Sequence, residues 1–227
     1  MERWLTFAAT LLFSAFGWTQ TQTQPKPQPH SPAPKTAATD TEPWEYSLTV
    51  DGYLIEGEDG YAQPTFTADH NWLHLEARYN YEGFRTGSLW AGYNFSWGET
   101  WQFAVTPMIG GVFGRTNGIA SGCEASLTWK KLTFSLDNEY VFNTTSKSGN
   151  FYYAWPQFTF QALKWLNFGA VAQHTKVFQT KLDIQQGFFV GVSRDVGHKP
   201  TKLEFTTYVF DPGTSSTSVV LELGASF

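Results

Sequence analysis

The sequence predicts an all-β protein whose strands close into an antiparallel up-and-down barrel that spans a membrane. Three observations predict it. Apolar and polar residues alternate from Trp44 to the end of the chain, the polar set consists mostly of small or amide side chains, and tryptophans gather beside every second turn. Alternation with a period of two residues indicates strands with one apolar and one polar face.

The first 43 residues are expected to lie outside this barrel. Residues 1–17 contain an uncharged apolar run after Arg3 and end in Ala15-Phe16-Gly17, a pattern that predicts a cleaved signal peptide. Residues 18–43 hold six of the chain's eleven prolines, among Gln, Thr, Ser and Ala. This composition has too little apolar surface to offset the entropy of ordering, so we expect a disordered linker.

Residues 44–227 are predicted to form the barrel. They contain no apolar stretch of the about 18 residues that a transmembrane helix needs, so only a closed barrel would cross a bilayer. The alternating segments are 45–56, 60–69, 72–82, 86–98, 100–114, 117–131, 132–144, 150–163, 165–179, 182–195, 200–211 and 216–227. They make about twelve strands, an even number as is usual for bacterial barrels. Pro64 weakens the second segment, and without it and a neighbour the count is ten.

The turns alternate in length, which predicts the orientation of the barrel. With the N-terminus in the periplasm, the periplasmic turns are short, as at Lys130-Lys131, and the opposite loops are often longer, as at 143–149. Short periplasmic turns and longer outer loops are typical of outer-membrane barrels. Residues 195–200 are an exception, because they form a long turn on the short side.

The polar faces of the strands are predicted to line a lumen. Soluble surfaces usually carry many Lys and Glu, whereas these faces carry Ser, Thr, Asn, Gln and Gly, and only 15% of the chain is charged. Small and amide side chains suit a confined polar interior, which leaves the apolar faces for hydrocarbon.

An aromatic girdle is expected at one rim, because barrels carry aromatic side chains where they cross the membrane interfaces. Its members are Trp44, Trp97, Trp101, Trp129 and Trp165. Trp72 lies at the same level, but Trp72 and Trp165 have the parity of the lumen. These two residues are therefore alternatively predicted to plug the lumen.

The chain ends in an alternating segment with a terminal aromatic residue. Val219, Leu221, Leu223, Ala225 and Phe227 share one parity. With the leader and the girdle, this ending resembles the outer-membrane β-barrel proteins of Gram-negative bacteria over residues 44–227. The resemblance implies an outer-membrane location, lipid contact and recognition of the last strand by the barrel-assembly machinery. It implies no particular activity.

Charged residues of lumen parity form the candidate functional site. The residues are His74, Glu76, Arg78, Glu124, Asp137, Glu139, Glu204 and Glu222, with Lys202 as a further candidate partner. Because unpaired charges are costly to bury, they are expected to form ion pairs. One interpretation is a network that fills and rigidifies the lumen, and the other is a selectivity constriction of charged side chains in a narrow pore.

Other kinds of site find little support in the sequence. The net charge of −5 gives no reason to expect nucleic-acid binding, and the single cysteine, Cys123, has no disulfide partner. No Gly-x-Ser-x-Gly elbow or phosphate loop occurs, so no cofactor is predicted. His74 and Glu76 share a face, but two ligands do not make a metal site. His174, near rim hydroxyls such as Ser148, is the one candidate for catalysis.

The sequence therefore predicts a small porin-like channel or passive barrel for small polar solutes. The alternatives are a non-conducting structural or interaction barrel, and an enzyme that modifies lipids at a rim site. The solute and the oligomeric state are not predicted.

Overall fold

The structure is a computed structural model that describes residues 43–55, 60–177, 182–197 and 201–227. The predicted signal peptide and nearly all of the predicted linker lie outside these residues. Within them, no helix is long and apolar enough to cross a membrane.

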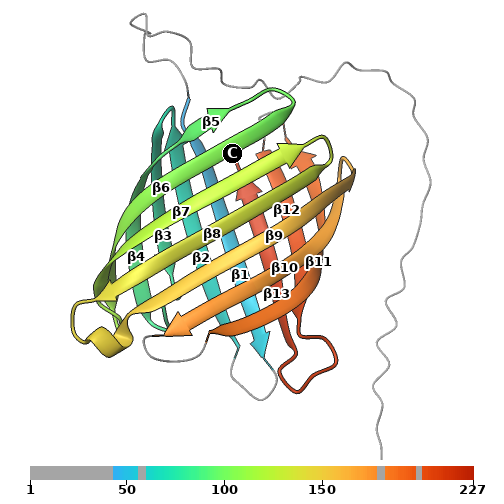
Figure 1. Cartoon of the computed structure of the whole chain (residues 1–227). Coiled ribbons are helices and arrows are strands. Elements are labelled where there is room, and N and C mark those ends of the chain that lie inside the picture. The colour runs from blue at the N-terminus through green and yellow to red at the C-terminus, as the bar shows by residue number, and fades with distance from the viewer. Residues whose placement is uncertain (1–42, 56–59, 178–181, 198–200) are drawn as a thin grey trace, which may run out of the picture.

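Antiparallel strands form one closed barrel (Figure 1). The strands are β1 Glu45–Ile55, β2 Tyr61–His70, β3 Leu73–Tyr79, β4 Thr86–Tyr93, β5 Phe95–Trp97, β6 Trp101–Gly114, β7 Gly118–Trp129, β8 Leu132–Asn143, β9 Phe151–Leu163, β10 Leu166–Val177, β11 Asp183–Val196, β12 Thr201–Phe210 and β13 Ser218–Ser226. A short 3-10 helix, η1 Lys147–Gly149, lies in the loop between β8 and β9.

The prediction of twelve strand positions is confirmed, and the alternative of ten is wrong. β4 and β5 both pair with β6 in one register, so together they fill one position, as the segment 86–98 predicted. In that register Pro107 lies opposite Tyr93, where the ladder is interrupted. Because proline has no N–H to donate, it explains the break. β2 forms despite Pro64, which lies opposite Val50 in β1.

Two seams close the sheet. β1 pairs with β13 over nine residue pairs from Ser47–Ser226 to Ile55–Ser218, and β4 pairs with β6. Tyr46 and Phe227 exchange two backbone hydrogen bonds of 2.9 Å, so the first and last strands start and end at the same rim. Figure 1 shows the η1 loop and the β12–β13 loop at the opposite end of the barrel. Among the described residues, every strand except the short β5 pairs along both edges, as a barrel needs in a medium without water, and β5 pairs with β6 alone.

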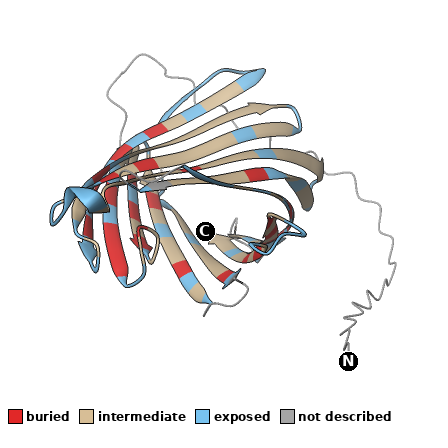
Figure 2. Ribbon diagram, turned by 60° about the horizontal axis from the view of Figure 1, so that its bottom comes forward, coloured by how far each residue is buried: buried red, intermediate tan, exposed pale blue. Residues whose placement is uncertain are grey.

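The outer surface of the barrel is apolar, and most of the polar side chains point inward. On β3, Leu75 and Tyr79 are exposed whereas His74, Glu76 and Arg78 are buried. Buried and exposed positions also alternate along β4, β6 and β11, and Figure 2 colours the strands by burial. Large apolar side chains are exposed all around the barrel, among them Leu89, Ile109, Ile119, Phe158, Phe188 and Leu223. This inside-out distribution requires a hydrocarbon environment around the barrel.

The lumen is less polar than its sequence pattern predicts. Two apolar clusters face inward near the strand ends at the η1 rim. One contains Tyr53, Val171, Phe189, Tyr208, Phe210 and Val220, and the other Trp90, Met108, Val112, Ala120 and Val141. Gly110 makes room for the second, because a Cβ there would lie 2.4 Å from the Trp90 ring. These clusters narrow the lumen at one end.

We predict that a charge on the outer face destabilises the barrel whereas the same charge on the inner face does not. Phe158, near the middle of β9, is 46% exposed on the outer face. Phe158→Arg should lower the free energy of unfolding in lipid vesicles by about 2–4 kcal/mol. Gln157→Arg, one residue away and lining the cavity with several carboxylates, is the matched control and should cost much less. If both variants lowered the free energy of unfolding equally, the assignment of Phe158 to the lipid face and Gln157 to the lumen face would be contradicted.

Candidate functional site

Strand β3 supplies the centre of the site. Its alternation places His74, Glu76 and Arg78 on the inner face, where their side chains are at most 5% exposed. Three consecutive inward positions on one short strand therefore carry three ionisable groups. Each of these groups needs partners within the lumen, because solvation by bulk water is largely lost.

The guanidinium of Arg78 joins strands that are not neighbours in the sheet. Its Nε and Nη2 donate to the two carboxylate oxygens of Glu76 at 2.8 and 2.9 Å, and Nη1 donates to Glu139 of β8 at 2.9 Å. β4, β6 and β7 lie between β3 and β8 in the sheet order, so the contact runs through the interior. The guanidinium also stacks on Tyr81 and Trp90, 4.3 and 4.7 Å from the ring centres. Arg78 therefore ties the two sides of the lumen together.

His74 begins a second chain of polar contacts. Its Nδ1 lies 2.8 Å from Oδ1 of Asp69 on β2, and that same oxygen accepts a hydrogen bond of 2.7 Å from Nδ2 of Asn94. The amide oxygen of Asn94 in turn accepts from the Thr106 hydroxyl at 2.7 Å. The other ring nitrogen, Nε2, is buried 3.5 Å from Glu76 and has no hydrogen-bond partner among the described residues. The ring is therefore hydrogen-bonded through Nδ1 alone.

A cavity of about 390 Å³ lies beside this network. Its polar lining includes the carboxylates of Asp51, Glu76, Glu124, Asp137 and Glu222, whereas Arg78 is the only lysine or arginine that the described part of the chain contributes. Rings of Tyr53, Tyr81, Tyr153, Trp155 and Tyr208 complete the wall. The interior is therefore polar and strongly acidic at this level.

The predicted site residues fall into three groups. His74, Glu76, Arg78 and Glu139 form the buried network, with Glu124 at 3.9 Å from Arg78. Asp137 and Glu222 line the cavity, where Glu222 accepts a hydrogen bond of 3.1 Å from Tyr208. Glu204 stands apart on β12, paired with Lys202 in a partly exposed contact. Whether the first two groups form a constriction stays a prediction.

Three acidic residues were missed by the sequence reasoning. Asp51 and Asp69 have lumen parity on β1 and β2, and Glu82 ends the predicted segment 72–82 with the parity of Glu76, so alternation could have identified all three, although the structure places Glu82 in the turn after β3. Glu82 is buried, and its Oε1 accepts hydrogen bonds from Ser88 and from the Trp90 indole at 2.5 and 3.2 Å.

The tryptophans of the predicted girdle lie near the rim at which β1 begins and β13 ends. Trp101 stacks on Trp129 with ring centres 5.2 Å apart, Trp97 stacks on Phe103, and Trp44 stacks on His70. Trp165 lies in the turn before β10 and is exposed. The prediction that Trp72 plugs the lumen is wrong, because Trp72 stacks on the outward-facing Tyr93. Turn residues do not follow the parity of the strands.

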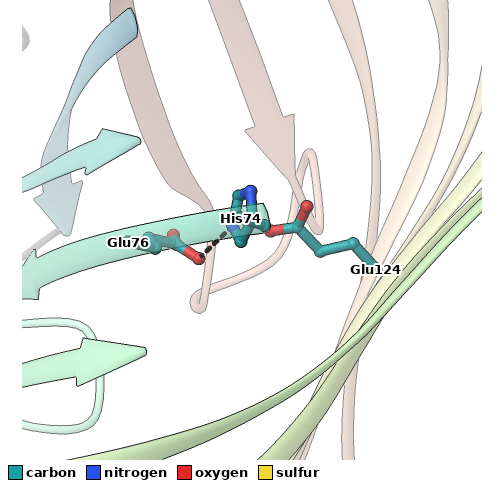
Figure 3. A group of neighbouring side chains, drawn as sticks. All are labelled: His74, Glu76 and Glu124. Carbon is teal, nitrogen blue, oxygen red and sulfur yellow. Dashed lines mark ion pairs between the residues drawn. The ribbon is translucent and has the colours of Figure 1, made fainter. Parts of the chain in front are cut away.

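The structure does not assemble a catalytic site around His174. This residue lies on the outer parity of β10, and among the described residues it makes no hydrogen bond to a hydroxyl or a carboxylate. By contrast, a third potential metal ligand joins His74 and Glu76. Glu124 of β7 approaches them, and one ligand atom from each residue lies within 4.8 Å of the others (Figure 3).

No protein-family model matches the chain, and no curated protein matches it in sequence. Solved structures do share its fold. The KdgM porin in complex with disordered oligogalacturonate is 13% identical with a TM-score of 0.55, and KdgM alone gives 13% and 0.54. Each match covers 80% of this chain and 98% of the porin. The Pseudomonas aeruginosa porin OccK2 with glucuronate is 11% identical, with a TM-score of 0.44 over 84% of this chain and 68% of that one.

The comparison with KdgM confirms the predicted fold class. The chain has the closed antiparallel β-barrel fold of an outer-membrane porin.

We predict that Arg78 stabilises the barrel far more than the surface-like pair on β12 does. Arg78→Met removes a cation that neutralises Glu76 and Glu139 and should cost about 3–5 kcal/mol of unfolding free energy. Lys202→Met, which breaks the partly exposed pair with Glu204, is the control and should cost less than about 1 kcal/mol. Urea unfolding in vesicles measures both. If Arg78→Met lowered the free energy of unfolding by less than Lys202→Met does, the Arg78 network would not be what stabilises the interior of the barrel.

Proposed function

We propose that the protein is an outer-membrane channel for small polar solutes that prefers cations over anions. The observation that carries this proposal is the charge of the cavity, where five carboxylates face one guanidinium. Fixed charge on the wall of a narrow water-filled lumen attracts mobile ions of opposite sign and repels those of the same sign.

The single cation in the wall offsets at most one of the five negative charges. All three donor nitrogens of Arg78 bind carboxylates, two to Glu76 and one to Glu139. Asp51 and Asp137 make no ion pair or side-chain hydrogen bond within the described residues. Their negative charge must therefore be balanced by protons or by mobile cations, and this requirement supports cation entry.

The comparison with KdgM supports a difference in the charge of the solute that each barrel accepts. KdgM was solved with oligogalacturonate, an acidic sugar polymer. Such a polymer would meet the carboxylates of Asp51, Glu124, Asp137 and Glu222 in this lumen. We infer that this chain uses a related barrel for neutral or cationic solutes, because anionic ones would be repelled.

The outer surface supports the proposed location. Apolar side chains face outward on every side, and the tryptophan rim suits one membrane interface. The C-terminal residues Val219, Leu221, Leu223 and Ala225 have outer parity on β13, and Phe227 packs beside Tyr46 at 6.0 Å. We propose that this strand is read by the barrel-assembly machinery during insertion and that residues 1–17 direct export.

A non-conducting barrel is the second candidate, and a specific feature favours it. The apolar clusters around Phe210 and Val141 narrow the lumen at the η1 rim, and Arg78 reaches across the interior to Glu139 beside the second cluster. We infer no enzyme activity, because His174 lacks a hydrogen-bonded partner among the described side chains.

Conductance across planar bilayers tests the proposal. We expect steps of conductance with a potassium-to-chloride permeability ratio above one. The triple variant Asp51→Asn, Asp137→Asn, Glu222→Gln should reduce that ratio by roughly fivefold, since one unit charge about 4 Å from an ion contributes about 1 kcal/mol even in water.

The double variant Lys202→Gln, Glu204→Gln is the control. It removes one charge of each sign from the lumen wall and should leave the ratio unchanged. A folded protein without conductance would favour the non-conducting barrel. Conduction with a preference for anions would contradict the role given to the cavity.

A further inference from the structure

We propose that His74, Glu76 and Glu124 bind a divalent transition-metal ion, with Zn²⁺ as the best fit, inside the lumen. The inference goes beyond the proposed function and does not depend on it, because a metal can bind whether or not the barrel conducts. Three features carry it: the positions of the ligand atoms, an unpaired ring nitrogen and the local charge.

The ligand atoms come from two strands that face each other across the interior. His74 and Glu76 lie on β3 and Glu124 on β7, with β4 and β6 between them in the sheet. Figure 3 shows the Glu124 side chain extending toward His74. One ligand atom from each residue lies within 4.8 Å of the others. Zinc ligands at about 2.0–2.2 Å lie somewhat closer together, so the site needs a small contraction. The Glu124 side chain, which is 36% exposed, has room to supply it.

The ring of His74 is oriented as a metal ligand. Its Nδ1 is held by Asp69 at 2.8 Å, and Asp69 is itself fixed by Asn94. Its Nε2 is buried without a hydrogen-bond partner and is directed toward Glu76. A carboxylate that accepts the Nδ1 proton leaves a lone pair on Nε2, and this arrangement is the usual support of a zinc-bound histidine. An unpaired buried nitrogen is costly, so a ligand at Nε2 would also satisfy it.

The local charge matches a divalent ion. Asp69, Glu76 and Glu124 contribute three negative charges, and Arg78, which is shared with Glu139, offsets at most one of them, so at least two negative charges remain around a neutral His74. Arg78 does not block Glu76, because a carboxylate oxygen can accept a hydrogen bond and bind a metal through separate lone pairs. The ring nitrogen favours Zn²⁺ and its first-row neighbours over Mg²⁺ and Ca²⁺, which prefer oxygen ligands alone.

Titration calorimetry of the full chain in detergent, after treatment with a chelator, tests the site. We expect one saturable Zn²⁺ site per chain that an excess of Mg²⁺ does not displace. His74→Gln and Glu124→Gln should each weaken Zn²⁺ binding by at least about tenfold, and Asp69→Asn by about tenfold through loss of the orienting hydrogen bond. X-ray absorption should show a nitrogen ligand together with oxygen ligands at about 2.0–2.2 Å.

Glu204→Gln is the matched control, because it removes a lumen carboxylate that is paired elsewhere, with Lys202. It should leave Zn²⁺ affinity unchanged, and circular dichroism should show that every variant keeps its β structure. No saturable Zn²⁺ binding by the wild type would overturn the proposal, and so would equal affinity in folded His74→Gln. Neither outcome would bear on conductance, which is measured without metal.

Discussion

The requirement that every backbone N–H and C=O be paired inside the protein controls the rest of this structure. Hydrocarbon offers no hydrogen-bond partner, so a sheet in a bilayer must close on itself. Here closure depends on two seams, between β1 and β13 and between β4 and β6. Once the sheet is closed, successive side chains of each strand point alternately to the lipid and to a shared interior. The charged side chains therefore point into the interior because of their position in the closed sheet, and not because of the conformational propensity of each residue.

Strand periodicity carried most of the predictable information. It identified the twelve strand positions and the inward faces, because each strand repeats the pattern of two residues that lipid on one side and lumen on the other impose. It failed where the chain leaves a strand. Trp72, in a turn, stacks on the outer surface against its parity. It also missed the break after Tyr93, which is caused by Pro107 on the opposite strand.

Contacts across the lumen could not be predicted from periodicity. A pattern of faces says that Arg78 and Glu139 both point inward, but not that β3 and β8 approach each other closely enough for a 2.9 Å hydrogen bond. That contact depends on the radius of the barrel and the stagger of its strands. The same holds for Glu204, which has the correct parity but pairs locally with Lys202. Alternation also does not show that apolar inward residues such as Phe210 and Val141 pack into clusters, because these contacts again join strands across the interior.

The excess of carboxylates links the stability of the lumen to what it can hold. Arg78 binds Glu76 and Glu139 and fixes them in place, so these two groups have a structural role that needs no ligand. The other cavity carboxylates make no comparable contact with a cationic side chain of the described residues. Asp51 and Asp137 repel their acidic neighbours across the cavity. A chain selected for stability alone would replace them with amides, which can hydrogen-bond without repulsion. Their presence therefore favours a lumen that takes up cations, and His74, held by Asp69 with its second nitrogen unpaired, marks the position where such a cation would be bound most tightly.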